Sequence, residues 1–123
     1  MFYVMHRFGV TDNELLDFVK YMNKSFGWPS ISIGIKERDR ETLLYLKNND
    51  VIPTYINIDV AHAYSSECYE MTQYVKSIFP LCYLIAGNVS SYEGVNFLNK
   101  AGADIVRIFI APGSGCLNIL TIS

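Results

Sequence analysis

Short apolar runs rich in β-branched and aromatic residues recur along the chain at intervals of roughly 25 residues. Runs of this length and composition, bounded by glycine, proline and polar residues, are typical of buried β-strands. The sequence therefore predicts five strands, which span Phe2–Met5, Ile31–Ile35, Tyr55–Val60, Leu81–Ala86 and Ile105–Ile110.

The four segments between these runs place apolar residues at steps of three and four, which is the spacing of one face of an α-helix. Residues that cap helices stand at their ends. The first helix is expected to begin at Thr11 or Asp12 and to end at Gly27. The others are expected at Asp39–Asn49, with Asp39 as the N-cap, at Ser65–Phe79, and at Ser91–Lys100, which Gly102 closes.

Alternating strands and helices with nearly continuous apolar strands are typical of a parallel sheet covered by helices. A flavodoxin-like doubly wound sheet and a piece of a β/α barrel both fit this order. A complete barrel needs about 250 residues, whereas this chain has 123. The pattern by itself therefore favours the doubly wound fold, which uses five strands at about this length.

Composition indicates one globular domain, because half of the residues are hydrophobic and 18% are charged. The net charge of −2 and the scattered Lys and Arg residues give no basic footprint for nucleic acid. The apolar runs fall far short of the roughly 20 residues that cross a bilayer. Residues 1–10 lack the order of a signal peptide, so we expect no membrane partner and a cytoplasmic location.

The three cysteines form no Cys-x-x-Cys pair, so neither a zinc site nor a disulfide framework is indicated. Cys68 lies in a helical pattern and Cys82 at the start of a strand, where we expect small buried hydrophobic residues. Cys116 follows two glycines and a serine in the segment Ala111–Cys116. Glycine backbone N–H groups and the Ser114 hydroxyl can form a phosphate cradle, and these amides together with Arg107 favour the nucleophilic thiolate of Cys116.

Polar residues also follow the other predicted strands, where ligands bind in either of the two folds. Asp59 and His62 follow the third strand, and Gly87 with Asn88 follows the fourth. Taken singly, each has a structural explanation as a turn, a helix cap or a loop residue. Their joint placement is better evidence for a site than any one of them.

The segment Val106–Cys116 resembles the catalytic-cysteine loop of the IMP dehydrogenase/GMP reductase family. Three further stretches agree in order and spacing: Ile58–His62, Ala86–Val89 and Ala101–Asp104. The opening Phe2–Phe8 and the segment Ser30–Lys36 look specifically like the bacterial GMP reductase branch.

The resemblance implies a partial (β/α)8 TIM barrel, with about four βα units plus a fifth strand. Residues 1–123 would be a single truncated barrel domain that lacks the first and last barrel strands. As an isolated open piece, it would form homo-oligomers or pair with a complementary barrel fragment, because it would have two unpaired strand edges.

The resemblance also implies an NADPH-dependent oxidoreductase that converts GMP to IMP through a cysteine thioimidate and is inactive as this isolated chain. Cys116 would be the catalytic nucleophile. The nucleotide phosphate would approach Gly113, Ser114 and Gly115, and the cofactor end would approach Asp59, Asn88 and Arg107. A monovalent cation such as K⁺ would be held by the carbonyl groups of Ala111, Gly113 and Cys116.

The chain departs from the family at four positions, where Phe109, Ala111 and Ala63 replace glycines and Asn118 replaces a threonine. A side chain at 109 or 111 disfavours the positive φ that a glycine turn permits. Two alternatives therefore stay open: an IMP dehydrogenase-like enzyme, or a non-catalytic barrel remnant with weak nucleotide binding. A self-contained doubly wound module would instead be a monomer.

Overall fold

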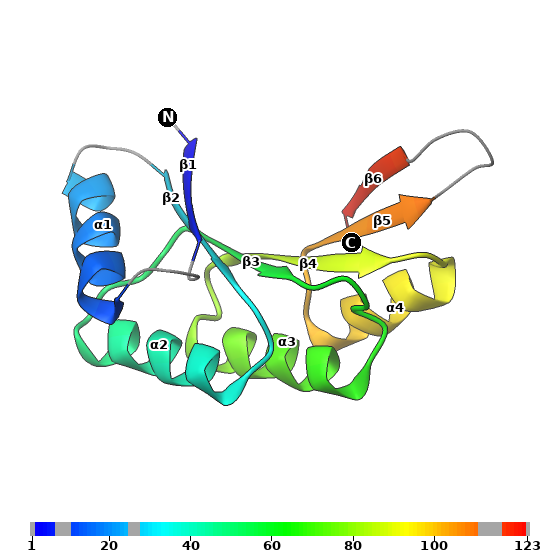
Figure 1. The fold of residues 1–123 in the computed structure, drawn as a ribbon, viewed down its shortest axis with the longest axis horizontal. Coiled ribbons are helices and arrows are strands. Elements are labelled where there is room, and N and C mark those ends of the chain that lie inside the picture. The colour runs from blue at the N-terminus through cyan, green and yellow to red at the C-terminus, as the bar shows by residue number, and fades with distance from the viewer. Residues whose placement is uncertain (1, 7–10, 25–27, 111–116, 123) are drawn as a thin grey trace.

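The computed structural model describes residues 2–6, 11–24, 28–110 and 117–122, which form ten secondary-structure elements (Figure 1). In chain order these are β1 (Phe2–His6), α1 (Asp12–Lys24), β2 (Trp28–Ile33), α2 (Glu37–Asn48), β3 (Tyr55–Asp59), α3 (Ser66–Ile78), β4 (Tyr83–Val89), α4 (Tyr92–Ala101), β5 (Ile105–Ile110) and β6 (Leu117–Ile122). The five predicted strands and four predicted helices are all present, with boundaries that differ by a few residues.

The strands form one sheet in the order β1-β2-β3-β4-β5-β6, and β1 to β5 are all parallel. Figure 1 shows the four helices on one side of a curved sheet, with β1 and β6 rising away from them. A doubly wound sheet needs a reversal in strand order and helices on both faces. The sequential order and the single helical layer instead make this chain part of a β/α barrel, as the family resemblance predicted and the pattern alone did not.

The hydrophobic core lies between the sheet and the helices. Side chains at alternate strand positions, such as Ile56 and Ile58 of β3 and Leu84 of β4, are fully buried there. The helices add a second layer of buried side chains: Leu15, Val19, Leu43, Leu46, Met71, Val75 and Leu98. Each such side chain stabilises the fold by about 1.5–3 kcal/mol relative to its exposed state. The opposite set of strand positions forms the concave face of the sheet.

Helix capping follows the sequence closely. Thr11 Oγ1 accepts a hydrogen bond from the Glu14 N–H, and the Thr11 N–H donates to the Glu14 carboxylate. Ser65 caps α3 and Ser91 caps α4 through their hydroxyl groups. Gly102 ends α4 at a φ of 120°, a value that side chains disfavour.

The N-cap expected for the second helix was wrong by one turn. Lys36 is the N-cap of α2, and Asp39 lies in the first turn, where its carboxylate accepts a hydrogen bond from the Lys36 N–H 3.1 Å away. An acidic side chain satisfies a free N–H equally well from this third helical position, as in a capping box. Gly27, expected to end the first helix, lies outside the described residues.

Strand β6 was not predicted. It pairs antiparallel with β5 along its whole length, from Ile110 opposite Leu117 to Ile105 opposite Ile122. In an all-parallel barrel the place beside β5 belongs to another parallel strand. The expectation that both edges of the five parallel strands lie open was therefore wrong on the β5 side, because a hairpin needs only a short connection and can fill that edge locally.

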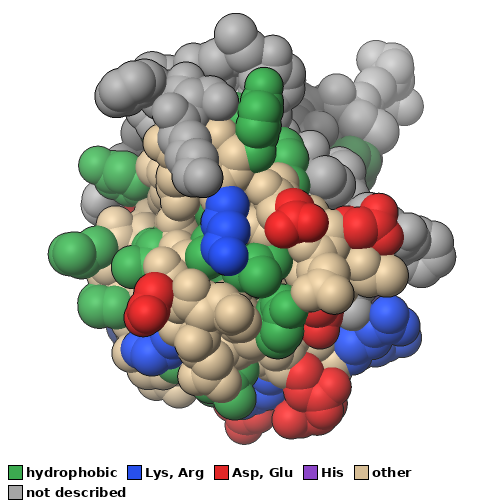
Figure 2. Space-filling model, turned by 90° about the vertical axis from the view of Figure 1, so that its left-hand side faces the viewer, with side chains coloured by type: hydrophobic (Ala, Val, Ile, Leu, Met, Phe, Trp, Pro, Cys, Tyr) green, Lys and Arg blue, Asp and Glu red, His purple; other side chains and the backbone are tan. Residues whose placement is uncertain are grey.

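Charged side chains of both signs are interspersed on the end of the molecule that carries α1 (Figure 2). Neither sign forms a continuous patch on that face. In the part of the chain that the structure describes, no helix is both long and apolar enough to cross a membrane.

Candidate functional site

The carboxyl ends of β3 and β4 are held together by backbone hydrogen bonds. The Val60 N–H donates to the Gly87 carbonyl at 2.8 Å, and the Asn88 N–H donates to the Val60 carbonyl at 2.6 Å. The Ala63 N–H then donates to the Asn88 carbonyl at 2.9 Å. Gly87 and Asn88 were predicted to follow the fourth strand, but they belong to β4, because these bonds extend the ladder past Ala86. The loop after β3 therefore has a fixed position beside β4.

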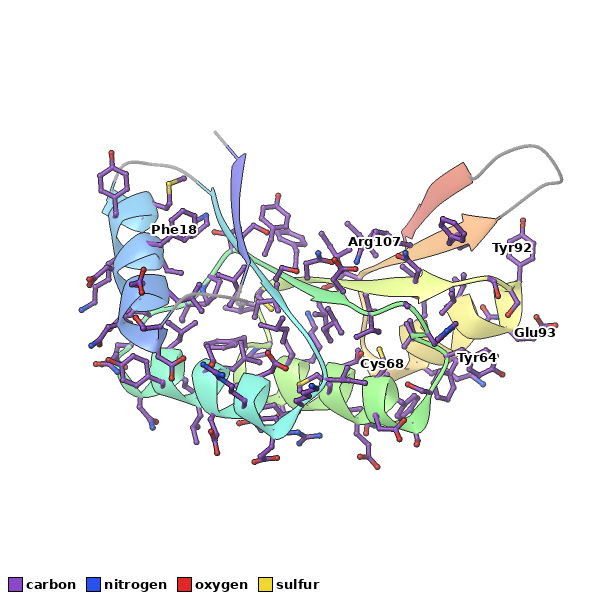
Figure 3. All side chains as sticks on the ribbon, in the orientation of Figure 1. Phe18, Tyr64, Cys68, Tyr92, Glu93 and Arg107 are labelled. Carbon is purple, nitrogen blue, oxygen red and sulfur yellow. The ribbon has the colours of Figure 1, made fainter. Side chains whose placement is uncertain are left out.

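Arg107 of β5 lies on the concave face and reaches across β4 to β3. Figure 3 shows its side chain on the face of the sheet opposite α3 and α4. Its Nη2 donates to Asn57 Oδ1 at 2.9 Å, to the Ile58 carbonyl at 3.4 Å and to Asp59 Oδ1 at 3.4 Å. The contact with Asp59 is also an ion pair between partly exposed side chains.

Gly87 is the residue of β4 that Arg107 crosses, since the two are register partners. A Cβ at position 87 would lie 2.7 Å from the Arg107 Cβ and 3.0 Å from its carbonyl oxygen. Neither atom is the end of a flexible side chain, so neither can move aside without moving the β5 backbone. Gly87 is therefore required for β4 and β5 to pair in this register.

We expect Gly87→Ala to lower the free energy of unfolding by about 1–3 kcal/mol, because the added methyl overpacks the contact with Arg107. Urea denaturation of both proteins measures this difference. Ser90→Ala, at an exposed position just after the same strand, is the matched control and should change the stability by less than about 0.5 kcal/mol. Equal stability of Gly87→Ala and the parent chain would contradict the close contact.

A cavity of about 250 Å³ opens at the carboxyl ends of β3, β4 and β5. Its apolar lining comes from Ala61, Val89 and Phe109, and its polar lining comes from His62, Tyr64, Asn88 and Ser90. Tyr64 is half exposed and its ring lies 4.9 Å from the ring of Phe97, which packs on Tyr69 in turn. Ligands of β/α folds bind at this edge of the sheet, so the cavity is a candidate small-molecule site.

Two buried polar atoms at this edge have no hydrogen-bond partner among the described residues. They are Asn88 Oδ1, which is an acceptor, and Arg107 Nε, which is a donor. A buried polar atom without a partner costs about 1–3 kcal/mol. A ligand that offers a donor and an acceptor here would remove that cost.

Three of the predicted site residues lie at this edge: Asp59 and Arg107 form an ion pair, and Asn88 lines the cavity. His62 also lines the cavity. The predicted residues of the glycine-rich loop, namely Ala111, Gly113, Ser114, Gly115 and Cys116, lie outside the described residues. In the described part of the chain, no three His, Cys, Asp or Glu side chains gather as a metal site.

Sequence reasoning missed Asn57, Ser32 and Tyr64. Asn57 stands two positions before Asp59, so both side chains lie on the same face of β3, and this spacing was the available signal. Ser32 lies on β2 directly opposite Asn57 in the register, which only strand pairing reveals. Phe109, noted as a departure from a family glycine, is part of β5, where it pairs with Asn118 and needs no positive φ.

Comparison with known proteins decides the family. A family model described as "IMP dehydrogenase / GMP reductase domain" matches residues 27–121. The chain belongs to the IMP dehydrogenase/GMP reductase family. Within this family, the GMP reductase of Ligilactobacillus salivarius is 40% identical over 119 residues, which is 97% of this chain and 36% of that protein. The GMP reductase of Bacillus subtilis is 40% identical over 116 residues, 94% of this chain and 35% of that protein.

The fold agrees with this family. The crystal structure of inosine 5′-monophosphate dehydrogenase from Legionella pneumophila matches with a TM-score of 0.71 at 27% sequence identity. The match covers 90% of this chain and 32% of that one. The chain thus spans about a third of the length of the relatives that it matches.

Proposed function

We propose that this chain carries part of the active site of a cytoplasmic GMP reductase, which reduces GMP to IMP with NADPH. The observation that carries the proposal is the cluster of Asp59, Asn88 and Arg107 beside a cavity at the carboxyl edge of the sheet. The names of the relatives favour GMP reductase over IMP dehydrogenase, since the bacterial GMP reductases are 40% identical and the IMP dehydrogenase structure is 27% identical.

The residues at this edge fit one end of a nicotinamide cofactor. Asn88, which lines the cavity, has a buried Oδ1 that could accept from a carboxamide N–H, and Arg107 on the neighbouring strand has a buried Nε that could donate to a carboxamide oxygen; both atoms lack partners among the described residues. The cavity of about 250 Å³ offers apolar walls, including Phe109, for a planar ring. Bound NADPH would supply a hydride for C2 of the purine.

The chemistry of the chain itself would centre on Cys116. Its thiolate would add to C2 of GMP, and the bond from C2 to the exocyclic nitrogen would break as ammonia leaves with a proton, which gives a thioimidate. After C2 is reduced, cleavage of the C–S bond would return the thiolate and release IMP. Gly113, Ser114 and Gly115 would hold the phosphate of the nucleotide through backbone and hydroxyl donors. The monovalent cation at Ala111, Gly113 and Cys116 remains a prediction from the family resemblance.

A barrel remnant that only binds nucleotides is the second candidate, and the open concave face favours it. Exposed Tyr83, stacked on Tyr55 at 5.3 Å, shows that the described part of the chain leaves this face uncovered at the start of β4. We therefore propose that the chain, as one partial barrel domain, binds the cofactor but needs a complementary barrel segment to catalyse the reduction of GMP. Association with such a segment, or with further copies, is part of this proposal.

The test combines cofactor binding with turnover. We expect NADPH to bind the chain, which a change in NADPH fluorescence on titration with the protein measures. Asn88→Leu or Arg107→Met should weaken that binding about tenfold. In the presence of GMP, we expect no loss of NADPH absorbance beyond that of Cys116→Ala.

The matched controls are Asn96→Leu and Arg38→Met, which change the same residue types at exposed helix positions. Both should bind NADPH as the parent chain does. The proposal fails if the parent chain binds no NADPH, or if the controls weaken binding as much as the site variants. A GMP-dependent rate that disappears in Cys116→Ala would show instead that this chain suffices for catalysis.

A further inference from the structure

A row of polar side chains crosses the concave face from β2 to β5. Asn57 Nδ2 donates to Ser32 Oγ at 3.4 Å, and Asn57 Oδ1 accepts from Arg107 Nη2 at 2.9 Å. Ser32 is 5% exposed, so the far end of the row is buried. Because Gly87 has no side chain, Arg107 can pass over β4 and join this row.

The orientation of the Asn57 amide follows from the chemistry of its neighbours. A guanidinium has donors and no acceptor, so Asn57 must turn its oxygen toward Arg107. Its NH₂ group then faces Ser32, whose hydroxyl oxygen can accept. The two contacts therefore hold Asn57 in one of its two possible amide orientations.

Asn57 is the closest of the three acceptors on Arg107 Nη2. The Ile58 carbonyl and the Asp59 carboxylate both lie at 3.4 Å. The Asp59 side chain is 46% exposed, and an ion pair with so much solvent contact contributes little to fixing a geometry. Asn57, held in turn by Ser32, is therefore the main restraint on the guanidinium.

With Nη2 fully engaged on β3, Arg107 Nε is left buried and without a partner among the described residues. Nε and Nη2 belong to one rigid planar group, so whatever fixes Nη2 also fixes the direction of the Nε–H. We propose that Asn57 is a positioning residue, which orients Arg107 so that its Nε–H is presented to an acceptor atom of the bound nucleotide cofactor. The identity of that ligand rests on the proposed function, whereas the orientation of Arg107 does not.

The orientation can be measured on the full chain without any ligand. The sequence has four arginines, and Arg107→Lys identifies the ¹⁵N Nε–H signal of Arg107 in an NMR spectrum. We expect this signal to be shifted from the other three and to exchange slowly with water. Asn57→Leu, which removes the acceptor, should move the signal to the position of a free arginine. Asn57→Asp, which keeps an acceptor oxygen, should retain it, and so should Asn48→Leu at an exposed position of α2.

Binding of NADPH provides the second measurement. Asn57→Leu should weaken binding about tenfold, Asn57→Asp should restore most of the affinity, and Asn57→Leu combined with Arg107→Met should be no weaker than Arg107→Met alone. If Asn57→Leu does not fold, Asn57→Ser, whose hydroxyl is too short to reach Arg107, replaces it.

An unchanged Arg107 signal in Asn57→Leu would overturn the inference, whether or not the affinity for NADPH changes. If the Arg107 signal of Asn57→Leu moves to the position of a free arginine while NADPH binding is unchanged, the inference is also overturned, because Asn57 would then serve the fold and not the ligand. If the parent chain binds no NADPH, the proposed function fails, and the NMR signal alone still decides whether Asn57 orients Arg107.

Discussion

At pH 7, iodoacetamide should label Cys116 at least about 100-fold faster than it labels Cys68 or Cys82. Burial raises the pKa of both Cys68 and Cys82 from 9.0 to about 11, and the thiolate is the reacting form. Two pKa units lower the thiolate fraction at pH 7 about 100-fold relative to an ordinary thiol. We predict that the glycine-rich amides of residues 111–116, together with Arg107, lower the pKa of Cys116. Timed labelling followed by mass spectrometry measures the three rates.

GMP or inorganic phosphate should slow the labelling of Cys116 by occupying the phosphate cradle, and should leave Cys68 and Cys82 unaffected. Equal rates at the three cysteines, unchanged by GMP, would contradict both the buried positions and the cradle.

The raised pKa values of Cys68 and Cys82 also predict that the stability of the fold falls at alkaline pH. Thiols of the unfolded chain ionise near pH 9, whereas the folded thiols keep their protons up to about pH 11. The stability that the two buried thiols contribute is therefore present below pH 9 and lost between pH 9 and 11.

Removal of residues 117–123 should convert the chain to large, open-ended assemblies at micromolar concentration. Without β6, β5 joins β1 as a free edge of a sheet whose remaining strands all run in one direction. The β5 edge of one copy can then pair in parallel with the β1 edge of the next, and such a head-to-tail contact repeats without closing. Size-exclusion chromatography with light scattering measures the mass.

The matched control is a chain shortened by Ser123 alone, which keeps all of β6 and should match the full chain in mass. Hydrogen exchange on the full chain gives an independent reading, because the backbone amides of β5 and β6 should be protected where the two strands pair. The same mass distribution with and without β6, or an unprotected β6, would show that β6 does not hold this edge.

Much of the fold could be predicted because its signals are local. Apolar alternation and helical spacing indicated all nine elements from Phe2 to Ile110. Ser65 and Ser91 marked two helix starts correctly, and of the two candidates for the first helix, Thr11 is the cap. The antiparallel strand β6 was missed because a strand of this kind is specified mainly by the edge that it joins. The choice between a barrel and a doubly wound sheet was also not local, since strand order depends on how successive units pack.

The candidate site divides in the same way. Asp59 and Asn88 could be proposed from the sequence because they stand at or just after the ends of predicted strands, and Arg107 because it lies in a strand whose continuation resembles the family's cysteine loop. Asn57 carries no such signal in the sequence, because 50 positions separate it from Arg107 and an asparagine inside a strand is usually explained by solvent exposure.

The sequence by itself determined which residues could form strands and helices, which face of each is apolar, and which family the strand-end motifs resemble. Only the tertiary structure decided that the strands follow one another in sequential order, that β6 fills the edge beside β5, and that Arg107 crosses Gly87 to reach Asn57. The physical reason is that side-chain periodicity is set within a few residues of the chain. Strand neighbours and cross-strand hydrogen bonds depend instead on contacts between segments far apart in sequence, which exist only once the sheet has formed.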